Sequence, residues 1–194
     1  SIFSFVVFSL TVEPTASYWD CAEYISTSAK LQVGHPPGAP LFQMLGAIFS
    51  TFAFESDQIA LSINMMSVTS SALTILFLFW SISHLIKPLV TPEKSISIIE
   101  AIRIFGSSTL GSLTFTFTDS FWFNAVEAEV YAMATLILSI LFWLGLKWTN
   151  EFEKNRPDKW LILISFVSGL SFGVHFMGLL AIPSIVLIYF FRKR

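Results

Sequence analysis

Two segments of the sequence carry closely spaced acidic side chains, and the first contains Asp20 and Glu23. These residues stand three apart, so on a helical turn both carboxylates lie on one face. Two like charges held close together raise at least one pKa, which suits a carboxylate for general-base catalysis. The structural alternative is that Asp20 caps a short interfacial helix over residues 17–30, with Glu23 in its first turn. Spacing alone favours capping.

The same segment continues into His35-Pro-Pro-Gly-Ala-Pro40, which is rigid and extended because each proline fixes its own backbone and restrains the residue before it. Composition favours a turn that feeds the next helix, although His35 could also contact a phosphate. Lys30 is the cation nearest to this run in the sequence. Trp19 suits an aromatic belt at the headgroup level, and an aromatic ring beside carboxylates also suits sugar stacking.

The second acidic segment runs from Asp119 through Glu127 and Glu129 to Tyr131. It is expected to open a membrane helix, on which Glu127 and Tyr131 share a face and Glu129 points elsewhere. Two acids at the start of a membrane helix are costly unless they face a hydrated cavity, so a functional role is favoured here. His175 stands at an expected outer turn, where a hydrated turn residue and a phosphate ligand are equally consistent with the pattern.

Composition indicates the elements that must position these side chains. Hydrophobic residues make up 54% of the 194 residues and charged residues 12%, and the mean hydropathy is +0.71. The expected fold is therefore an all-α integral membrane protein, a bundle of several spans. The scattered Lys and Arg side chains argue against a nucleic-acid partner. The lone Cys21 forms no internal disulfide, and no Cys/His metal-ligand motif is present, so no metal ligands are predicted.

The expected spans follow from apolar runs of about 20 residues. They cover residues 58–86, 101–118, 124–148, 160–174 and 177–191, and residues 1–12 form the end of a first span. The apolar run 41–54 is short, so we expect it to lie in the interface and to leave residues 13–57 as one outer loop carrying interfacial helices. The chain opens without a Met directly into an apolar run, which suggests a truncated sequence.

The distribution of cations predicts the orientation. With this topology ten of the eleven Lys and Arg residues fall on one side and only Lys30 on the other, which is a strong positive-inside signal. The ten are Lys87, Lys94, Arg103, Lys147, Lys154, Arg156, Lys159, Arg192, Lys193 and Arg194. The opposite, outer side then carries eight of the thirteen acids, including the five named in the two segments above. Chemistry is therefore expected outside the cytosol.

Three motifs carry a resemblance to a known family: Trp19-Asp-Cys-Ala-Glu23, Gly34-His-Pro-Pro-Gly38, and Phe121-Trp-Phe-Asn-Ala-Val-Glu127-Ala-Glu129-Val-Tyr131. With them the sequence resembles the DUF2723 family, which includes TMEM260-like protein O-mannosyltransferases and belongs to the GT-C glycosyltransferases. The match runs from about residue 11 to the end. It implies a GT-C-like multi-span bundle of which residues 1–194 are the N-terminal part, with further spans and a soluble C-terminal region absent.

The resemblance also implies a mechanism. Asp20 matches the acid that acts as base on the acceptor hydroxyl, and the implied donor is a sugar, with mannose expected, on a polyprenyl phosphate held in the membrane lipid. Glu23 would orient Asp20 or hold the acceptor protein, and Glu127 and Glu129 would line the cavity with Tyr131 and Trp19. The leaving phosphate needs positive charge. Lys30, His35 and His175 are the candidates, and a divalent metal would also serve.

Two rival functions predict different features. A transporter would place its acids near mid-membrane and show inverted repeats, whereas here the acids cluster at the outer ends and no repeat is found. A non-catalytic subunit of a larger membrane complex would tolerate Asp20→Asn. The closeness of the motifs to bacterial members favours a bacterial inner membrane with residues 13–57 in the periplasm, and the endoplasmic reticulum is the second choice.

Overall fold

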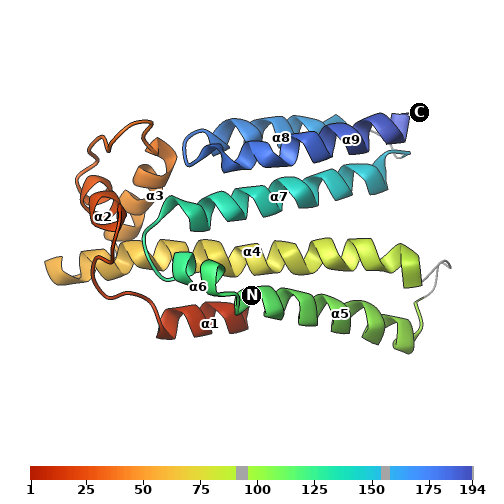
Figure 1. The fold of residues 1–194 in the computed structure, drawn as a ribbon, viewed down its shortest axis with the longest axis horizontal. Helices are drawn as coiled ribbons and strands as arrows, with labels where there is room; N and C mark the ends of the chain where they lie inside the picture. The colour runs from red at the N-terminus through yellow and green to blue at the C-terminus, as the bar shows by residue number, and fades with distance from the viewer. Residues whose placement is uncertain (91–95, 154–157, 194) are drawn as a thin grey trace.

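The computed structural model describes residues 1–90, 96–153 and 158–193, and within these ranges the chain is helical with no strand (Figure 1). The prediction of an all-α fold is confirmed for this part of the chain. Four cations used to predict the orientation, Lys94, Lys154, Arg156 and Arg194, lie outside the described residues.

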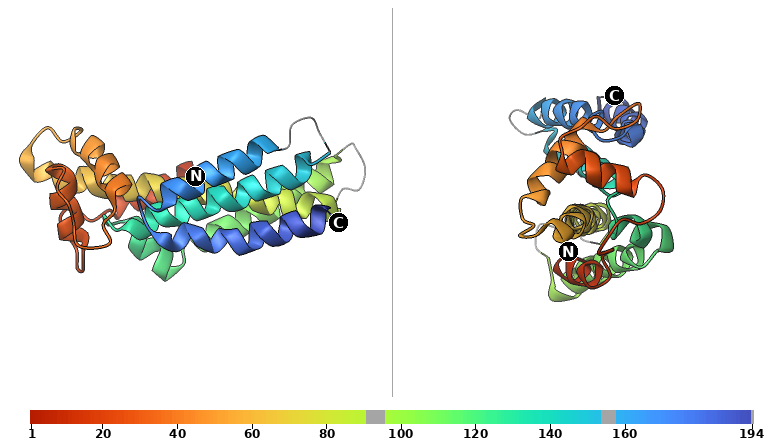
Figure 2. Two further views of the ribbon diagram at one scale, coloured as in Figure 1. Left: turned by 90° about the horizontal axis from the view of Figure 1, so that it is seen from above. Right: turned by 90° about the vertical axis from the view of Figure 1, so that its left-hand side faces the viewer.

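The helices form an elongated bundle around one long central helix, α4 (Ile59–Val90) (Figures 1 and 2). Helices α5 (Ile98–Thr116) and α7 (Val130–Glu151) pack along α4, and α1 (Ile2–Leu10) packs on the part of α4 beyond the end of α5. Helices α8 (Asp158–Ser171) and α9 (Ala181–Lys193) cover the far side of α7.

Small hydroxyl side chains bring α5 close to its neighbours. Ser108, Ser112 and Thr116 stand four residues apart on α5, and all three are buried. Ser83 of α4 donates to Ser108 across 2.9 Å, and Ser4 of α1 lies 3.2 Å from Thr116 between their hydroxyl oxygens. Small residues in this spacing let helix backbones approach, and their hydroxyls bond across the interface, as is common in membrane bundles.

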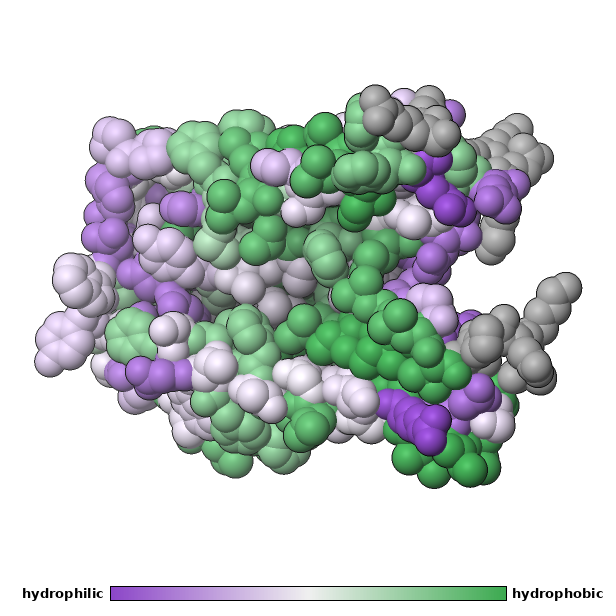
Figure 3. All heavy atoms as spheres, turned by 45° about the vertical axis from the view of Figure 1, so that its right-hand side comes forward, coloured by the Kyte–Doolittle hydropathy of each residue, from purple (hydrophilic) through white to green (hydrophobic). Residues whose placement is uncertain are grey.

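Two helices are long and apolar enough to cross a membrane, Ser56–Val90 and Val130–Glu151. Large apolar side chains also stand exposed on α1, α5, α8 and α9, among them Ile2, Leu10, Ile102, Leu110, Ile162, Phe166, Leu187 and Phe191. Figure 3 shows apolar side chains over the middle of one face and hydrophilic ones gathered toward its two ends. Exposed apolar surface on this scale indicates a membrane location.

The span expected at 124–148 begins later than predicted. Helix α6 (Asp119–Ala125) ends before the acids, and α7 begins at Val130, so Glu127 lies in an irregular stretch and Glu129 is the N-cap residue of α7. The prediction that Glu127 and Tyr131 share one helix face is therefore wrong. A continuous helix would have carried both carboxylates into the apolar bundle. The irregular stretch is instead fixed by a 2.9 Å bond from the backbone N–H of Glu13 to the carbonyl of Val126.

Other expected spans are short helices in the structure. Helix α8 has 14 residues and α9 has 13, joined by residues 172–175 and a 3₁₀ helix, η2 (Phe176–Leu180). Helix α3 (Pro40–Ser50) covers most of the short apolar run 41–54. Its 11 residues extend about 16 Å, about half of the hydrocarbon thickness. The membrane position of these helices stays a prediction.

The two ends of the bundle differ in charge. Helices α2 (Cys21–Ala29) and α3 lie at one end, on the left in Figure 1, together with both acidic segments. The helix ends at the other side carry most of the described cations, which are Lys87, Arg103, Lys147, Lys159 and Arg192. The end that carries α2 and α3 is called the acidic end below.

Candidate functional site

Glu23 and His35 form the tightest polar contact at the acidic end. The backbone N–H of His35 donates to Glu23 Oε1 across 2.6 Å, and His35 Nδ1 lies 3.0 Å from Glu23 Oε2. The backbone and ring hydrogen bonds from His35 lower the pKa of Glu23, and the carboxylate of Glu23 raises the pKa of His35. The other ring nitrogen, Nε2, lies 3.8 Å from Asp20 Oδ2, so the imidazole bridges the two carboxylates.

Glycines let the loop after α2 close over Glu23. A Cβ at Gly34 would lie 3.1 Å from Glu23 Oε1 and 3.0 Å from Gln43 Nε2, which leaves little room for any other residue. Gly38 has a φ of +79°, a left-handed conformation that glycine adopts without strain. The rigid segment that starts at His35 is thus folded back onto α2, as a turn into α3.

Asp20 occupies the N-cap position of α2, but its side chain makes no capping hydrogen bond. The capping role that spacing favoured is therefore wrong. The Asp20 side chain is 55% exposed, and the residue before it, Trp19, has a φ of +62° and is 85% exposed. A left-handed backbone at a bulky residue costs about 1–3 kcal/mol and is concentrated at functional sites. The strained residue, Trp19, directly precedes Asp20 and sets the direction of the backbone there.

Glu127 and Glu129 are buried beside Asp20. Glu127 is 2% exposed and its Oε2 accepts a hydrogen bond from Ser17, whereas its Oε1 has no partner among the described residues. Glu129 is 6% exposed, and its Oε1 is likewise without a partner there. Burial raises the pKa of Glu127. Burial first, then the charges of Glu127 and Asp20, raise the pKa of Glu129 to about 7.

Two adjoining cavities share Asp20, Glu129 and Tyr131 in their walls. The larger has a volume of about 370 Å³ and is also lined by Trp19, Phe123, Asn124 and Glu127. The smaller has a volume of about 170 Å³ and includes Tyr24, His35, Val174 and His175. The larger falls in the size range of small-molecule sites and combines aromatic walls with carboxylates, a composition that suits a sugar. Asp20 stands where the two cavities meet.

His175 closes the smaller cavity from the turn before η2. Its Nδ1 accepts a hydrogen bond of 3.1 Å from the backbone N–H of Met177, so the neutral ring carries its proton on Nε2. The ring packs against Tyr131 at 5.3 Å between centroids. His175 therefore caps a turn and also lines the cavity, and a role toward phosphate stays a prediction.

Lys30 is not brought to this site. It lies at the other end of α2, whose nine residues span about 14 Å, and it lines neither cavity. The described residues that line the two cavities include three acids and two histidines but no Lys or Arg, so the site is acidic.

A buried asparagine of the central helix, Asn64, holds the segment that precedes Asp20. Asn64 of α4 is fully buried, and its side-chain amide donates to the carbonyls of Glu13 and Thr15 across 2.6 and 2.8 Å. These bonds fasten the segment before Asp20 to the central helix. A polar side chain inside an apolar span was the available signal.

Gly173 contacts the start of α3 from the turn that carries His175, a residue of the smaller cavity. Its carbonyl accepts from the backbone N–H of Leu41 across 2.7 Å, and a Cβ at Gly173 would lie 2.8 Å from Leu41 Cβ. The turn that carries His175 is therefore docked directly on the start of α3.

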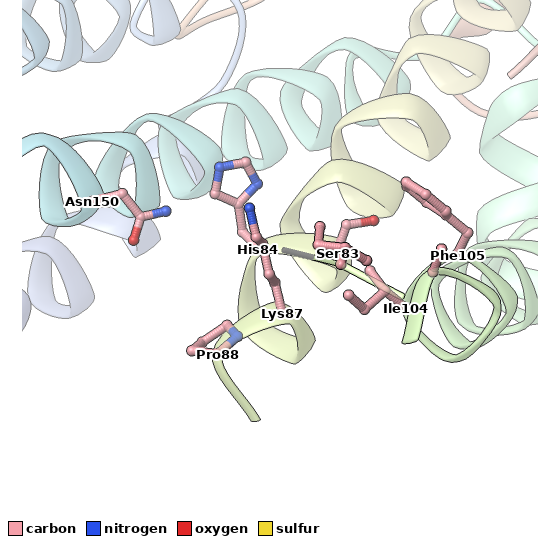
Figure 4. A pocket seen from close by; sticks show the side chains of 9 residues that line it. Ser83, His84, Lys87, Pro88, Ile104, Phe105 and Asn150 are labelled. Carbon is pink, nitrogen blue, oxygen red and sulfur yellow. The ribbon is translucent and has the colours of Figure 1, made fainter. Parts of the chain in front are cut away.

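A larger cavity, of about 540 Å³, lies at the opposite end of the bundle (Figure 4). Its polar walls come from Ser83, His84, Lys87 and Asn150, and none of its described lining residues is an acid. A cavity without a carboxylate offers no match for the general base expected here, so the acidic end remains the candidate site.

Comparisons with known proteins bear on residues 20–194, which match the family described as the Protein O-mannosyl-transferase TMEM260 N-terminal domain. A relative from Dictyostelium discoideum named Protein O-mannosyl-transferase tmem260 is 24% identical over 97% of this chain and 22% of its own length. A Mus musculus relative, Protein O-mannosyl-transferase TMEM260, is 26% identical over 85% of this chain and 21% of its own length. The chain thus spans about a fifth of these relatives. No solved structure matches it significantly.

Proposed function

Because the chain belongs to the TMEM260 N-terminal domain family of protein O-mannosyl-transferases, we propose that it is the acceptor-activating part of a GT-C-type membrane glycosyltransferase. The names of the relatives support a transferase that acts on protein. The donor would be a polyprenyl-phosphate sugar, with mannose as the sugar, and the acceptor a Ser or Thr hydroxyl. The proposal places the acidic end on the non-cytosolic side of the membrane.

One observation carries the proposal: Asp20 is a carboxylate with no capping bond, placed where two cavities meet. An acceptor hydroxyl in one cavity and a sugar in the other would bring oxygen and anomeric carbon together beside Asp20. Asp20 would take the hydroxyl proton as the oxygen bonds to the anomeric carbon. The bond from that carbon to the phosphate oxygen breaks, the electron pair leaves with the lipid phosphate, and the configuration inverts.

The other acids act around this step. Glu23 reaches Asp20 only through His35, so its part is to hold the imidazole in place and not to touch the acceptor. Glu129, with a pKa of about 7, would form hydrogen bonds to sugar hydroxyls as donor or acceptor. Trp19 and Tyr131 offer exposed rings for stacking against the sugar.

The position of the acids also separates this proposal from a transporter. Asp20, Glu23, Glu127 and Glu129 all lie outside the two helices long enough to span a membrane. A proton or ion pathway needs carboxylates within the spans.

The test is the glycan occupancy of exported proteins, measured by intact-mass spectrometry in cells that carry the full-length protein with Asp20→Asn. We expect occupancy to fall at least 100-fold, the usual contribution of a general base, while the amount of protein in the membrane stays normal. Asp57→Asn, an exposed acid at the same end of the bundle, is the matched control. Unchanged occupancy at normal protein level would remove Asp20 from the chemistry.

The compartment is part of the proposal. Both relatives come from eukaryotic organisms, and the sequence motifs resemble bacterial members as well. In a bacterial inner membrane the acidic end would face the periplasm, and in the endoplasmic reticulum it would face the lumen. The chemistry is the same in either place.

A further inference from the structure

Three side chains at the acidic end converge in a way that the transfer step alone does not require. Asp20, Glu23 and His35 each offer one ligand atom, and these atoms all lie within 4.8 Å of one another. Two carboxylate oxygens and an imidazole nitrogen form a common donor set for a divalent cation of the Mn²⁺ or Fe²⁺ kind.

The loop around this cluster fixes the imidazole between the two carboxylates. His35 Nδ1 lies 3.0 Å from Glu23 Oε2, and Nε2 faces Asp20 Oδ2 at 3.8 Å. The loop closure at Gly34 and Gly38 sets this ring orientation before any ligand arrives.

A second observation is independent of the cluster. Glu129 is 94% buried and lines both cavities with Asp20 and the smaller one also with His35. Its Oε1 has no partner among the described residues. An unpaired carboxylate oxygen in such a place destabilises the fold, because it has lost its water without gaining a hydrogen bond. A cation in the smaller cavity would lower that cost.

The proposed donor also requires positive charge at this site. A polyprenyl phosphate is an anion, and the described cavity walls hold three acids against two histidines, with no Lys or Arg. The phosphate would be repelled from this site unless positive charge is added.

We infer that Asp20, Glu23 and His35 bind one divalent cation, which takes an oxygen of the donor phosphate. Asp20 contributes Oδ2, the oxygen that faces His35, and keeps Oδ1 for the acceptor proton. The cation neutralises the acidic wall and stabilises the charge on the leaving phosphate. This inference deepens the proposed transfer function and rests on it for the identity of the ligand, but the cation site itself is tested without the reaction.

The probe is Mn²⁺, added to the purified, metal-stripped, full-length protein in detergent micelles and followed by electron paramagnetic resonance. We expect one Mn²⁺ per chain at this site, with affinity reduced by about 10–100-fold or more in Asp20→Asn and in His35→Gln. Asp57→Asn is the control for the loss of an exposed acid at the same end.

A spectroscopic signature identifies the ligand. Electron spin echo modulation of bound Mn²⁺ shows coupling to a directly ligated imidazole nitrogen, and we expect it to vanish in His35→Gln and to remain in His175→Gln. His175 lines the same cavity but is outside the cluster, so it is the matched histidine control. Absence of Mn²⁺ binding, or binding that is indifferent to Asp20 and His35, overturns the cation site.

The outcomes for site and reaction are separable. Mn²⁺ binding with the nitrogen signature but no sugar transfer by the wild-type protein would keep the cation site and reject the proposed function. Sugar transfer that survives complete chelation, with no Mn²⁺ bound, would keep the function and reject the cation site.

Discussion

Burial distinguishes four acids of the candidate site, Asp20, Glu23, Glu127 and Glu129, from one another. Asp20 and Glu23 retain substantial exposure and can meet a ligand with little rearrangement, whereas Glu127 and Glu129 are more than nine-tenths buried. A buried carboxylate costs folding energy when it is ionised. Because Glu127 and Glu129 are both buried at this cost, we expect them to serve the functional site and not the stability of the fold.

Glu127→Gln tests this cost through the pH dependence of stability. The pKa of Glu127 is raised from 4.5 by burial, so the native state holds this proton more tightly than the unfolded state. Stability therefore falls as the pH rises above about 4.5, and the fall ends once the pH exceeds the raised native pKa. We expect Glu127→Gln to match the wild type near pH 4.5 and to exceed it in thermal midpoint at pH 8.

The measurement is thermal unfolding of the full-length protein in detergent over that pH range. Glu55→Gln, an exposed acid near the start of α4, is the control and should follow the wild-type curve. Parallel curves for wild type and Glu127→Gln would show that the burial of Glu127 has no energetic effect.

At the scale of elements, single contacts fasten the site loops to the bundle. Asn64 holds the segment before Asp20 onto α4, and Gly173 holds the turn before η2 onto α3. Neither residue lines the two cavities. Substitution of either residue is therefore expected to disturb the site without removing a side chain that lines it.

Asn64→Leu removes both amide hydrogen bonds and leaves the carbonyls of Glu13 and Thr15 without that donor. We expect a loss of about 1–3 kcal/mol in stability and faster proteolytic cleavage near residues 13–20. Met65→Leu, a volume-conserving change at the next position, should alter neither. Equal cleavage rates in the two variants would mean that Asn64 does not fasten the loop.

Gly173→Ala and Gly169→Ala form a pair with opposite expected signs. At Gly173 the new Cβ would lie 2.8 Å from Leu41 Cβ, whereas at Gly169 in α8 it meets nothing within 4 Å. We expect Gly173→Ala to destabilise by about 1–3 kcal/mol and to weaken transfer by displacing His175. Gly169→Ala should stabilise α8 by about 0.5–1 kcal/mol. Thermal unfolding compares them, and a shared sign would contradict the docking role of Gly173.

At the scale of the whole molecule, the separation of charge along the bundle predicts which ends face opposite sides of the membrane. Asp57 is exposed at the acidic end and Lys159 at the basic end. In sealed vesicles of known orientation, we expect a membrane-impermeant maleimide to label Asp57→Cys and Lys159→Cys from opposite sides. Native Cys21 is fully buried and should stay unlabelled. Labelling of both positions from one side would reject the orientation.

The sequence predicts the long elements better than the site. The apolar runs that form α4 and α7 are long and strongly hydrophobic, so composition and length are enough to predict these two helices. The contact between Glu23 and His35 joins residues 12 apart across a loop whose path depends on Gly34, Gln43 and the docking of Gly173. No local pattern encodes such a path. The break before α7 was not predicted, because the apolar run 124–148 is typical of one continuous helix. In the structure α6 ends at Ala125 and α7 begins at Val130, with Glu127 and Glu129 between them.

The length of α4 sets the height of the site relative to the bilayer. Its 32 residues extend about 48 Å, against a hydrocarbon core of about 30 Å. Even at a tilt of about 40°, near the limit seen for membrane helices, the helix projects about 37 Å along the membrane normal. Lys87 lies in the last turn, where we expect it to anchor that end at the headgroups. The excess length would then emerge at the acidic end and would hold α2 and α3 above the hydrocarbon core. In the proposed transferase, an acceptor polypeptide would reach Asp20 without entering the lipid, while the polyprenyl chain of the donor would remain in the bilayer.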